Sequence, residues 1–267
     1  MTDTPIEAKS HFYAHGERLL REEIERTEPP FKRRVVIGDC TLYEADCLEL
    51  MPTLGEFDAV ITDPPYGIGY SPGSGGKGWT KGVKTFSGKD IIIGDKKPFN
   101  PSALLALNVP CILWGANHYA DKLPAKDSWL VWDKREGACQ NDFADCELAW
   151  FSKGGPARVF RHLWNGALRK SERGITRVHP TQKAIAVMEW CLGFLPDATT
   201  ILDPFMGSGT TGVACVKLGR KFTGIELDPD YFDIACSRIE EAYRQPDMFI
   251  APPAPKPEQL DMLEGEE

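Results

Sequence analysis

The chain has 267 residues, of which 42% are hydrophobic and 26% charged, and this suits one α/β domain with a sizeable core. No apolar stretch approaches the roughly 18 residues of a membrane span, and residues 1–10 lack a signal-peptide core, so we expect a cytoplasmic protein without membrane contact. The net charge of −8 argues against a nucleic-acid partner unless basic residues are concentrated locally.

The first third of the chain predicts a polar arm and then two β segments. The arm covers residues 1–34, and the first β-rich segment covers 34–45, with Asp46 directly after it. An apolar run over 57–62 predicts a buried strand. It leads straight into the tetrapeptide Asp63, Pro64, Pro65 and Tyr66, which therefore stands at a strand's end.

The middle of the chain alternates short helices and strands around two loops. Residues 67–97 are rich in Gly and Lys without periodicity and predict a long loop, as binding loops often are. The expected strands cover 109–114, 129–132 and 147–151, and the expected helices cover 101–108 and 118–123. Residues 154–177 form the second predicted loop.

Basic charge is concentrated in these two loop regions. Residues 151–183 carry eight Lys/Arg against one acid, and residues 69–97 carry six Lys against two acids. Solvated loops would explain many such runs. Here the arginines interleave with Phe160, His162 and Trp164, which favours a nucleic-acid surface.

The last third predicts a repeating helix and strand order. A helix is predicted over 181–195, because its apolar residues recur three or four positions apart and would form one buried face, with Thr181 placed to cap it. Strands at 199–202 and 221–227 alternate with helices at 210–218 and 229–244, which predicts a parallel sheet with helices on both faces. The main domain thus covers 35–244, and the Pro-rich, acidic tail over 245–267 is expected to be disordered.

The eight cysteines form no C-x-x-C pair, and several lie within apolar runs. Buried reduced thiols fit this pattern better than disulfides or zinc ligands. No histidine cluster accompanies them, so no metal site is predicted.

A glycine loop between a strand and a helix predicts a nucleoside cofactor. Gly207, Gly209 and Gly212 also match the spacing of a dinucleotide-binding loop. Asp203 at the loop's start would repel pyrophosphate but accept a bond from an ammonium, which favours S-adenosylmethionine. Glu226, 19 residues after Gly207, is placed to bind ribose hydroxyls. A Gly-rich turn with a solvated acid is the alternative.

The tetrapeptide at 63–66 suits the binding of a flat base with an exocyclic amine. Such an amine is a poor nucleophile because its lone pair is delocalised into the ring. Bonds to Asp63 and to the Pro64 carbonyl would favour a tetrahedral nitrogen, so positioning could supply most of the rate without a strong base. Tyr66 can stack on a base removed from the duplex. A tight Pro-Pro turn is the structural alternative.

Together these motifs resemble the β-group DNA amino-methyltransferases, which act on adenine N6 or cytosine N4. The target motif [DNS]-P-P-[YF] corresponds to residues 63–66, and the cofactor motif F-x-G-x-G to 205–209. A third signature, H-P-T-x-K-P, corresponds to 179–184, with Ala184 in place of the usual proline. The target motif precedes the cofactor motif, which is the permuted order of the β group. The matches span residues 35–240.

The resemblance implies a Rossmann-like methyltransferase fold, with a seven-stranded, mainly parallel sheet that has one antiparallel strand. It also implies the roles of the site residues. Asp46 would bind the cofactor's adenine and Glu226 its ribose, while Thr181 and Lys183 would lie near its carboxylate. The methionine part would meet the remaining cofactor residues, Asp203, Phe205, Gly207, Ser208 and Gly209.

The expected substrate is double-stranded DNA, with site-specific methylation of the kind found in restriction-modification systems. Asp63 favours adenine N6, because the family's cytosine-N4 enzymes more often carry Ser at this position. Methylation of RNA or protein amines is a runner-up, and a DNA-binding module without activity is the non-enzyme alternative. The loops at about 69–97 and 154–177 are the candidates for DNA contact. Many β-group members are dimers, so a homodimer is one option.

The tail suggests one further partner. Residues Gln259–Leu263 resemble the Q-L-[SD]-L-F peptide that docks on the bacterial sliding clamp. A chance match in an acidic tail is the competing interpretation.

Overall fold

The computed structural model describes residues 29–69, 93–137, 144–165, 168–175, 177–179 and 181–245. Most of the arm over 1–34, most of the 69–97 loop and nearly all of the tail, including Gln259–Leu263, lie outside the described residues. Within the described ranges, no helix is both long and apolar enough to cross a membrane. The fold below is therefore that of the central domain.

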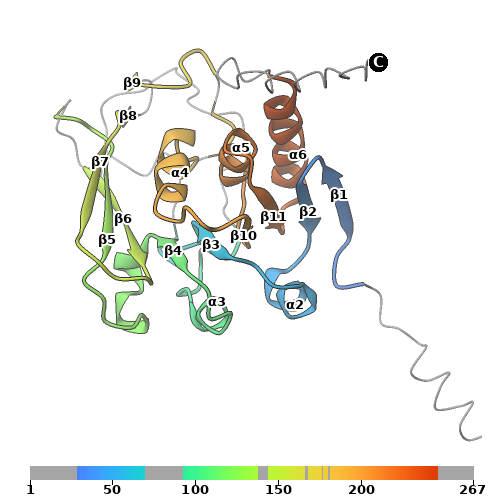
Figure 1. Ribbon diagram of the computed structural model, residues 1–267, viewed down its shortest axis with the longest axis horizontal. Helices are drawn as coiled ribbons and strands as arrows, with labels where there is room; N and C mark the ends of the chain where they lie inside the picture. The colour runs from blue at the N-terminus through green and yellow to red at the C-terminus, as the bar shows by residue number, and fades with distance from the viewer. Residues whose placement is uncertain are drawn as a thin grey trace, which may run out of the picture.

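Nine of the described strands form one sheet in the order β1-β2-β11-β10-β3-β4-β6-β5-β7 (Figure 1). In chain order, these strands are β1 (Arg33–Ile37), β2 (Cys40–Glu44), β3 (Ala59–Thr62), β4 (Cys111–Trp114), β5 (Trp129–Asp133), β6 (Cys146–Phe151), β7 (Arg158–Arg161), β10 (Thr200–Asp203) and β11 (Lys221–Glu226). A separate antiparallel pair joins β8 (Trp164–Asn165) to β9 (Leu168–Arg169).

The expected fold class is confirmed, but the sheet has two strands more than expected. β2, β11, β10, β3 and β4 run parallel, and β6 is antiparallel to both β4 and β5. Without the edge strands β1 and β7, the sheet therefore has seven strands with one reversed. β1 joins because Gly38, at φ +54°, turns the chain into a hairpin with β2.

The second extra strand lies in a region that the sequence predicts to be loop. β7 pairs in parallel with β5, with Arg158 opposite Leu130 and Arg161 opposite Asp133. Its side chains are mostly exposed, so apolar alternation, the usual signal of a strand, is missing. The 154–177 region is thus partly a strand at the sheet's edge and partly the β8–β9 hairpin.

Helices cover both faces of the sheet (Figure 1). α4 (Ile185–Leu192), α5 (Thr210–Lys217) and α6 (Pro229–Arg244) lie on one face, and α2 (Cys47–Leu50) and α3 (Ser102–Leu105) lie on the other. Within the described residues there are also three 3-10 turns: η1 (Met51–Thr53), η2 (Ala116–His118) and η3 (Ala120–Lys122). The helix predicted over 118–123 is therefore replaced by η2 and η3.

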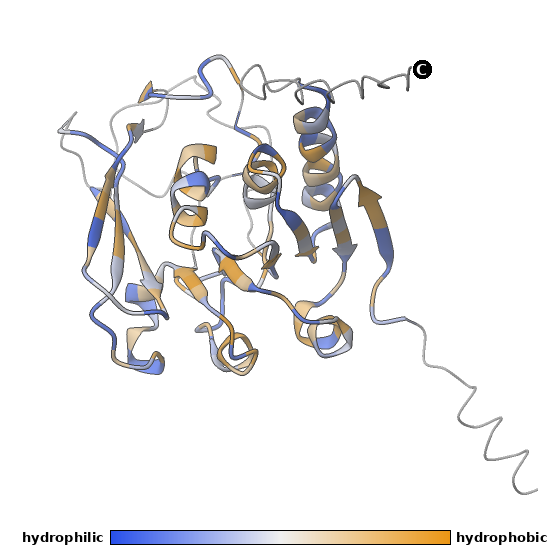
Figure 2. Ribbon diagram, in the orientation of Figure 1, coloured by the Kyte–Doolittle hydropathy of each residue, from blue (hydrophilic) through white to orange (hydrophobic). Residues whose placement is uncertain are grey.

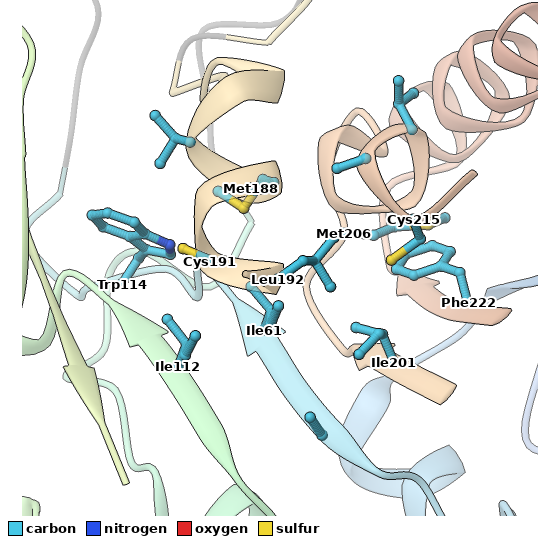
Figure 3. Packing of buried hydrophobic residues seen from close by; sticks show 14 of the residues in the cluster. Ile61, Ile112, Trp114, Met188, Cys191, Leu192, Ile201, Met206, Cys215 and Phe222 are labelled. Atoms are coloured by element: carbon cyan, nitrogen blue, oxygen red, sulfur yellow. The ribbon is translucent and has the colours of Figure 1, made fainter. Parts of the chain in front are cut away.

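Two apolar layers, one on each face, bury the central strands. β3 and β4 are buried along their whole length and are apolar except for Thr62 at the end of β3 (Figure 2). In the layer beneath α4 and α5, Ile61 and Ile112 pack with Met188, Leu192 and Ile201 (Figure 3). The seven described cysteines are free thiols, and five of them are buried. This packing fixes the strand ends from which the polar motifs extend.

The helix predicted over 181–195 begins later than expected. α4 starts after Ala184, whose side chain makes no capping hydrogen bond, so the predicted cap at Thr181 is wrong. The hydroxyl of Thr181 instead lies 3.1 Å from His179 Nδ1. Glu172 accepts a 3.0 Å bond from the Ile185 N–H, which supplies an acceptor from the distant 168–175 segment.

Candidate active site

The polar motifs meet at one edge of the sheet because they follow parallel strands. Glu226 pairs with Glu44 at the end of β2, and Asp203 at the end of β10 pairs with Gly224 of β11. Asp63 follows β3, which runs parallel to β10. The carboxyl ends of parallel strands are where open α/β sheets bind ligands. The target and cofactor motifs predicted from the sequence are therefore neighbours.

A direct hydrogen bond links the two motifs. Thr62, the last residue of β3, donates from its hydroxyl to Asp203 Oδ1 over 2.6 Å. Thr211 donates to Asp203 Oδ2, also over 2.6 Å, and the Phe205 N–H donates to Oδ1 over 3.1 Å. Asp203 is only 3% exposed, so both of its oxygens are engaged inside the protein.

Asp203 is held in place by the protein itself. Its carboxylate accepts bonds from Thr62, Thr211 and the Phe205 N–H, and its expected bond to a ligand ammonium stays a prediction. Burial raises the pKa of its carboxyl to about 6, against the opposing effect of the two threonine bonds. Asp203 thus holds the start of the glycine loop through its bonds with the Phe205 N–H and with Thr211.

The target motif forms a compact polar group. Tyr66 donates its hydroxyl to Asp63 Oδ1, and Lys183 Nζ lies 2.5 Å from Asp63 Oδ2. Pro64 is buried and Pro65 is half-buried, so the turn between them is held in the protein body. Burial raises the pKa of the Asp63 carboxyl, while Lys183 opposes that shift.

The Tyr66 ring is clamped between two groups on the segment after β4. It stacks on His118, with 5.0 Å between ring centroids and 16° between planes. Its other neighbour is Gly115, where a Cβ atom would lie 1.9 Å from Tyr66 Cε1. Only a glycine leaves room for the ring there, and φ +66° at Gly115 favours glycine as well.

Lys183 of the third signature lies beside the target motif. Its Nζ stands between two protein carboxylates, Asp63 at 2.5 Å and Glu147 at 2.8 Å, and the side chain is 5% exposed. The cation also lies 5.6 Å from the centre of the Trp114 ring. Its expected place near the cofactor carboxylate stays a prediction.

Glu147 is a site residue that the sequence reasoning missed. It is the second residue of β6, and it also pairs with Lys134 Nζ at 2.9 Å. Despite its burial, these two lysines lower the pKa of Glu147 to about 2. The sequence motifs are found as polar residues that directly follow a strand. Glu147 instead lies at the start of its strand, because β6 runs antiparallel to its neighbours and brings its first residues to this edge of the sheet.

The glycine loop is held by Glu226 and Arg238. Gly207 and Gly209 take positive φ values of +52° and +77°, and Glu226 Oε2 accepts a 2.9 Å bond from the Gly207 N–H. Arg238 of α6 donates to the Ser208 carbonyl over 2.6 Å and to its hydroxyl over 2.9 Å. Both sides of the loop are thereby fixed.

The residues expected at a nucleoside lie around this loop. Glu226 also accepts a 2.8 Å bond from the Asp228 N–H, and burial raises the pKa of its carboxyl to about 7. Asp46 is exposed and caps α2 through a 2.8 Å bond from the Leu48 N–H. Phe205 is half-buried and meets Phe99 edge to face.

These residues fit a nucleoside cofactor with a charged amino-acid end. Each Glu226 oxygen accepts one backbone bond and keeps a further lone pair for a hydroxyl group. Gly207 has no side chain, and its backbone approaches His179 closely, since a Cβ would lie 3.6 Å from that ring. The third signature thus adjoins the glycine loop through His179, while its lysine faces the target motif.

The comparisons with known proteins agree with this arrangement. Residues 86–237, more than half of the chain, match the family model N6_N4_Mtase, described as DNA methylase. The chain therefore belongs to this family of DNA methylases, and the resemblance drawn from the motifs is confirmed.

Three type II methyltransferases are among the similar proteins. M2.LlaDCHI of Lactococcus lactis subsp. cremoris is 33% identical over 113 residues, which are 42% of this chain and 41% of the relative. M2.DpnII of Streptococcus pneumoniae is 42% identical over 84 residues, 31% of each chain. M.ScaI of Streptomyces caespitosus is 28% identical and aligns with 76% of this chain and 82% of its own. The chain thus spans less than half of the first two relatives.

Two solved structures are also similar. The M1.HpyAVI–SAM complex has a TM-score of 0.44 and 25% identity, covering 74% of this chain and 99% of its own. The cytosine-N4-specific PvuII DNA methyltransferase has a TM-score of 0.49 and 14% identity, covering 80% and 95%.

Proposed function

We propose that this chain transfers a methyl group from S-adenosylmethionine to the exocyclic amine of a base in double-stranded DNA, with adenine N6 as the target. One observation carries the proposal. The residue before the target motif, Thr62, is bonded to Asp203, which opens the glycine loop, over 2.6 Å. An amine held at Asp63 would therefore lie next to a ligand held by the glycine loop.

The residues of the target motif would bind and orient the amine. Asp63 supplies a carboxylate acceptor whose position is fixed by Tyr66 and Lys183. A hydrogen bond from the amine to Asp63 would turn the nitrogen lone pair out of conjugation and toward the donor. The proton can leave after the nitrogen–carbon bond has formed, so Asp63 need not be a strong base.

The cofactor would supply an electrophilic methyl group on a sulfonium. Glu226 would bind its ribose and Asp46 its adenine, while the loop from Phe205 to Gly209 would receive the methionine part. Asp203 supports that loop through Thr211 and through the Phe205 N–H. These assignments are supported by the shared edge of the sheet on which all these residues lie.

DNA would approach over the basic segments. The described ends of the 69–97 segment meet beside Tyr66, where Asp95 accepts a 2.8 Å bond from the Gly67 N–H. The other segment offers exposed Arg158 and Arg161 on β7. The nearby β8–β9 hairpin borders a hollow of about 310 Å³, lined by Leu163, Leu168, Arg169, Arg173 and Gly174. Arginines beside apolar groups suit a nucleic-acid backbone and its bases.

Adenine is favoured over cytosine by Asp63, and the cytosine-N4 reaction is the alternative. The homodimer, the sliding-clamp contact of Gln259–Leu263 and the cytoplasmic location stay predictions.

The test is methyl incorporation from labelled S-adenosylmethionine into unmethylated genomic DNA, followed by digestion to nucleosides. We expect label in N6-methyl-2′-deoxyadenosine. Label in N4-methyl-2′-deoxycytidine would replace adenine by cytosine, and label only in RNA or protein would refute the DNA assignment. Asp63→Ala should abolish transfer and leave cofactor binding largely intact.

A further inference from the structure

A cluster of charged side chains, with Lys183 buried and its partners half-buried, lies directly behind the target motif. Lys183 Nζ is 2.5 Å from Asp63 Oδ2 and 2.8 Å from Glu147 Oε2, and it donates to the Tyr66 hydroxyl over 3.4 Å. Lys134 Nζ lies 2.9 Å from Glu147 Oε1. The cluster joins residues that are far apart in the sequence and balances two acids with two bases.

Stability alone gives little reason for this cluster. Lys183 is 5% exposed, and taking its ammonium out of water is costly, so an apolar residue of similar volume would often serve a core as well or better. Lys183 is followed directly by Ala184, which is fully buried in the apolar core. We therefore look for the role of the Lys183 cation at the carboxylate that it contacts, which is that of Asp63.

The geometry of Asp63 indicates that role. Tyr66 and Lys183 occupy its two oxygens, so an incoming amine must share or replace one of these donors. Tyr66 is held by stacking on His118, whereas Lys183 already has a second carboxylate in contact, Glu147. Lys183 is thus the donor that can leave Asp63 without losing its charge partner.

We propose that Lys183 and Glu147 are positioning residues for methyl transfer: Lys183 keeps the Asp63 carboxylate charged and aimed until the target amine arrives, and Glu147 then retains Lys183 as the amine takes its place. This inference rests on the proposed function. No bond other than hydrogen bonds changes in this exchange. Loss of Lys183 leaves Asp63 buried without its cation, and loss of Glu147 ties Lys183 to Asp63 alone.

Several other titratable groups face this cluster from the surrounding elements. Burial raises the pKa of the Tyr66 and Tyr119 hydroxyls and of the Cys191 thiol, so all three are neutral near pH 7. Burial and Lys183 lower the pKa of His179 to about 3. The groups that carry charge toward Asp63 are Lys183, Glu147, Lys134 and Asp203.

The test measures the titration of Asp63 itself and the pH profile of methyl transfer in the full-length chain. Carbon-13 labelling of aspartate carboxyls, with Asp63→Asn to assign the signal, gives the Asp63 pKa by NMR. In Lys183→Met we expect this pKa to rise by about one to three units, because burial is no longer opposed. Lys183→Arg keeps a cation and should leave the titration near that of the wild type.

Activity gives the second readout. With unmethylated genomic DNA, the loss of methyl transfer in Lys183→Met should be greatest at the acid end of the pH profile and shrink as the pH rises, because Asp63 ionises at a higher pH than in the wild type. Glu147→Gln should lower kcat about tenfold or more and leave the affinity for S-adenosylmethionine within about twofold. A merely structural role would lower the rate equally at every pH.

The outcomes separate this inference from the proposed function. If the wild type methylates DNA but the Asp63 titration is the same in Lys183→Met, the inference is overturned and the function stands. If the wild type transfers no methyl group and the Asp63 pKa still rises, the charged cluster stands and the proposed function fails. A Lys183→Met enzyme with a wild-type pH profile would also overturn the inference.

Discussion

Replacing Gly115 by alanine should disable the target site without unfolding the protein. The new Cβ would lie 1.9, 2.2 and 2.4 Å from three atoms of the Tyr66 ring, where ordinary contacts begin at about 3.4 Å. The overlap is therefore more than 1 Å, and neighbouring atoms that yield by tenths of an ångström cannot absorb it. The Tyr66 ring must move, and its hydroxyl must leave Asp63.

We expect Gly115→Ala to lower kcat about 100-fold, because displacement of a positioning group by about 1 Å costs that much in rate. Radiolabelled methyl incorporation measures the rate, and calorimetric titration of S-adenosylmethionine should show nearly unchanged affinity, since the glycine loop lies on other strands. The free energy of unfolding in urea measures the accompanying loss of stability.

The chain offers a matched control. Gly219 has φ +63°, close to the +66° of Gly115, but a Cβ there would meet nothing within 4 Å. Gly219→Ala should therefore lose only the conformational cost of about 1 kcal/mol and keep full activity. In a Tyr66→Ala background the extra destabilisation by Gly115→Ala should disappear. Equal effects of the two glycine substitutions on rate and stability would refute the steric reasoning.

Three further changes test other parts of the structure. Asp58 accepts three bonds, from the Thr199 hydroxyl and N–H and from the Thr200 N–H, and these bonds lower the pKa of its carboxyl. The stability lost in Asp58→Asn should therefore be greatest near pH 7 and shrink below about pH 4, where the unfolded chain takes up a proton at Asp58 before the folded protein does. Urea unfolding at several pH values measures this. Because burial raises the pKa of Glu226 to about 7, its ionised fraction rises about tenfold between pH 6 and 8, and the affinity for S-adenosylmethionine should rise with it in calorimetric titration but not in Glu226→Gln. Arg238→Met, which removes the bonds to Ser208, should raise KM for S-adenosylmethionine about tenfold with little change in kcat; a change in kcat alone would contradict this.

Much of the fold could be predicted because its signals are local. The continuous apolar runs at 59–62 and 111–114 are typical of buried parallel strands, and helix α6 begins and ends at the predicted residues 229 and 244. In these segments the burial pattern and the strand or helix preference agree. The two motifs at the ends of β3 and β10 could be found for the same reason.

The parts that the sequence could not predict depend on contacts between distant segments. β7 has exposed side chains and becomes a strand only because β5 offers a free edge. The acceptor at the start of α4 is Glu172, 13 residues upstream, so no capping residue next to the helix marks its beginning. The motif that contains Lys183 suggests a role at a ligand, but it does not show the two carboxylates that Lys183 contacts. These are Asp63, directly after β3, and Glu147 of β6.

The reversed strand β6 has a consequence for how the target site can vary between related chains. Within one sheet, a parallel strand presents its last residues to this edge, whereas β6 presents its first, so Glu147 depends on the connection that precedes it. Glu147 stands opposite Trp132 and Cys146 opposite Asp133, and neighbouring residues of a strand point to opposite faces. A slip of one residue in the pairing of β6 with β5 would exchange the carboxylate at Lys183 for a neighbouring side chain. The register of this one reversed strand therefore decides whether Lys183 has a second carboxylate beside it.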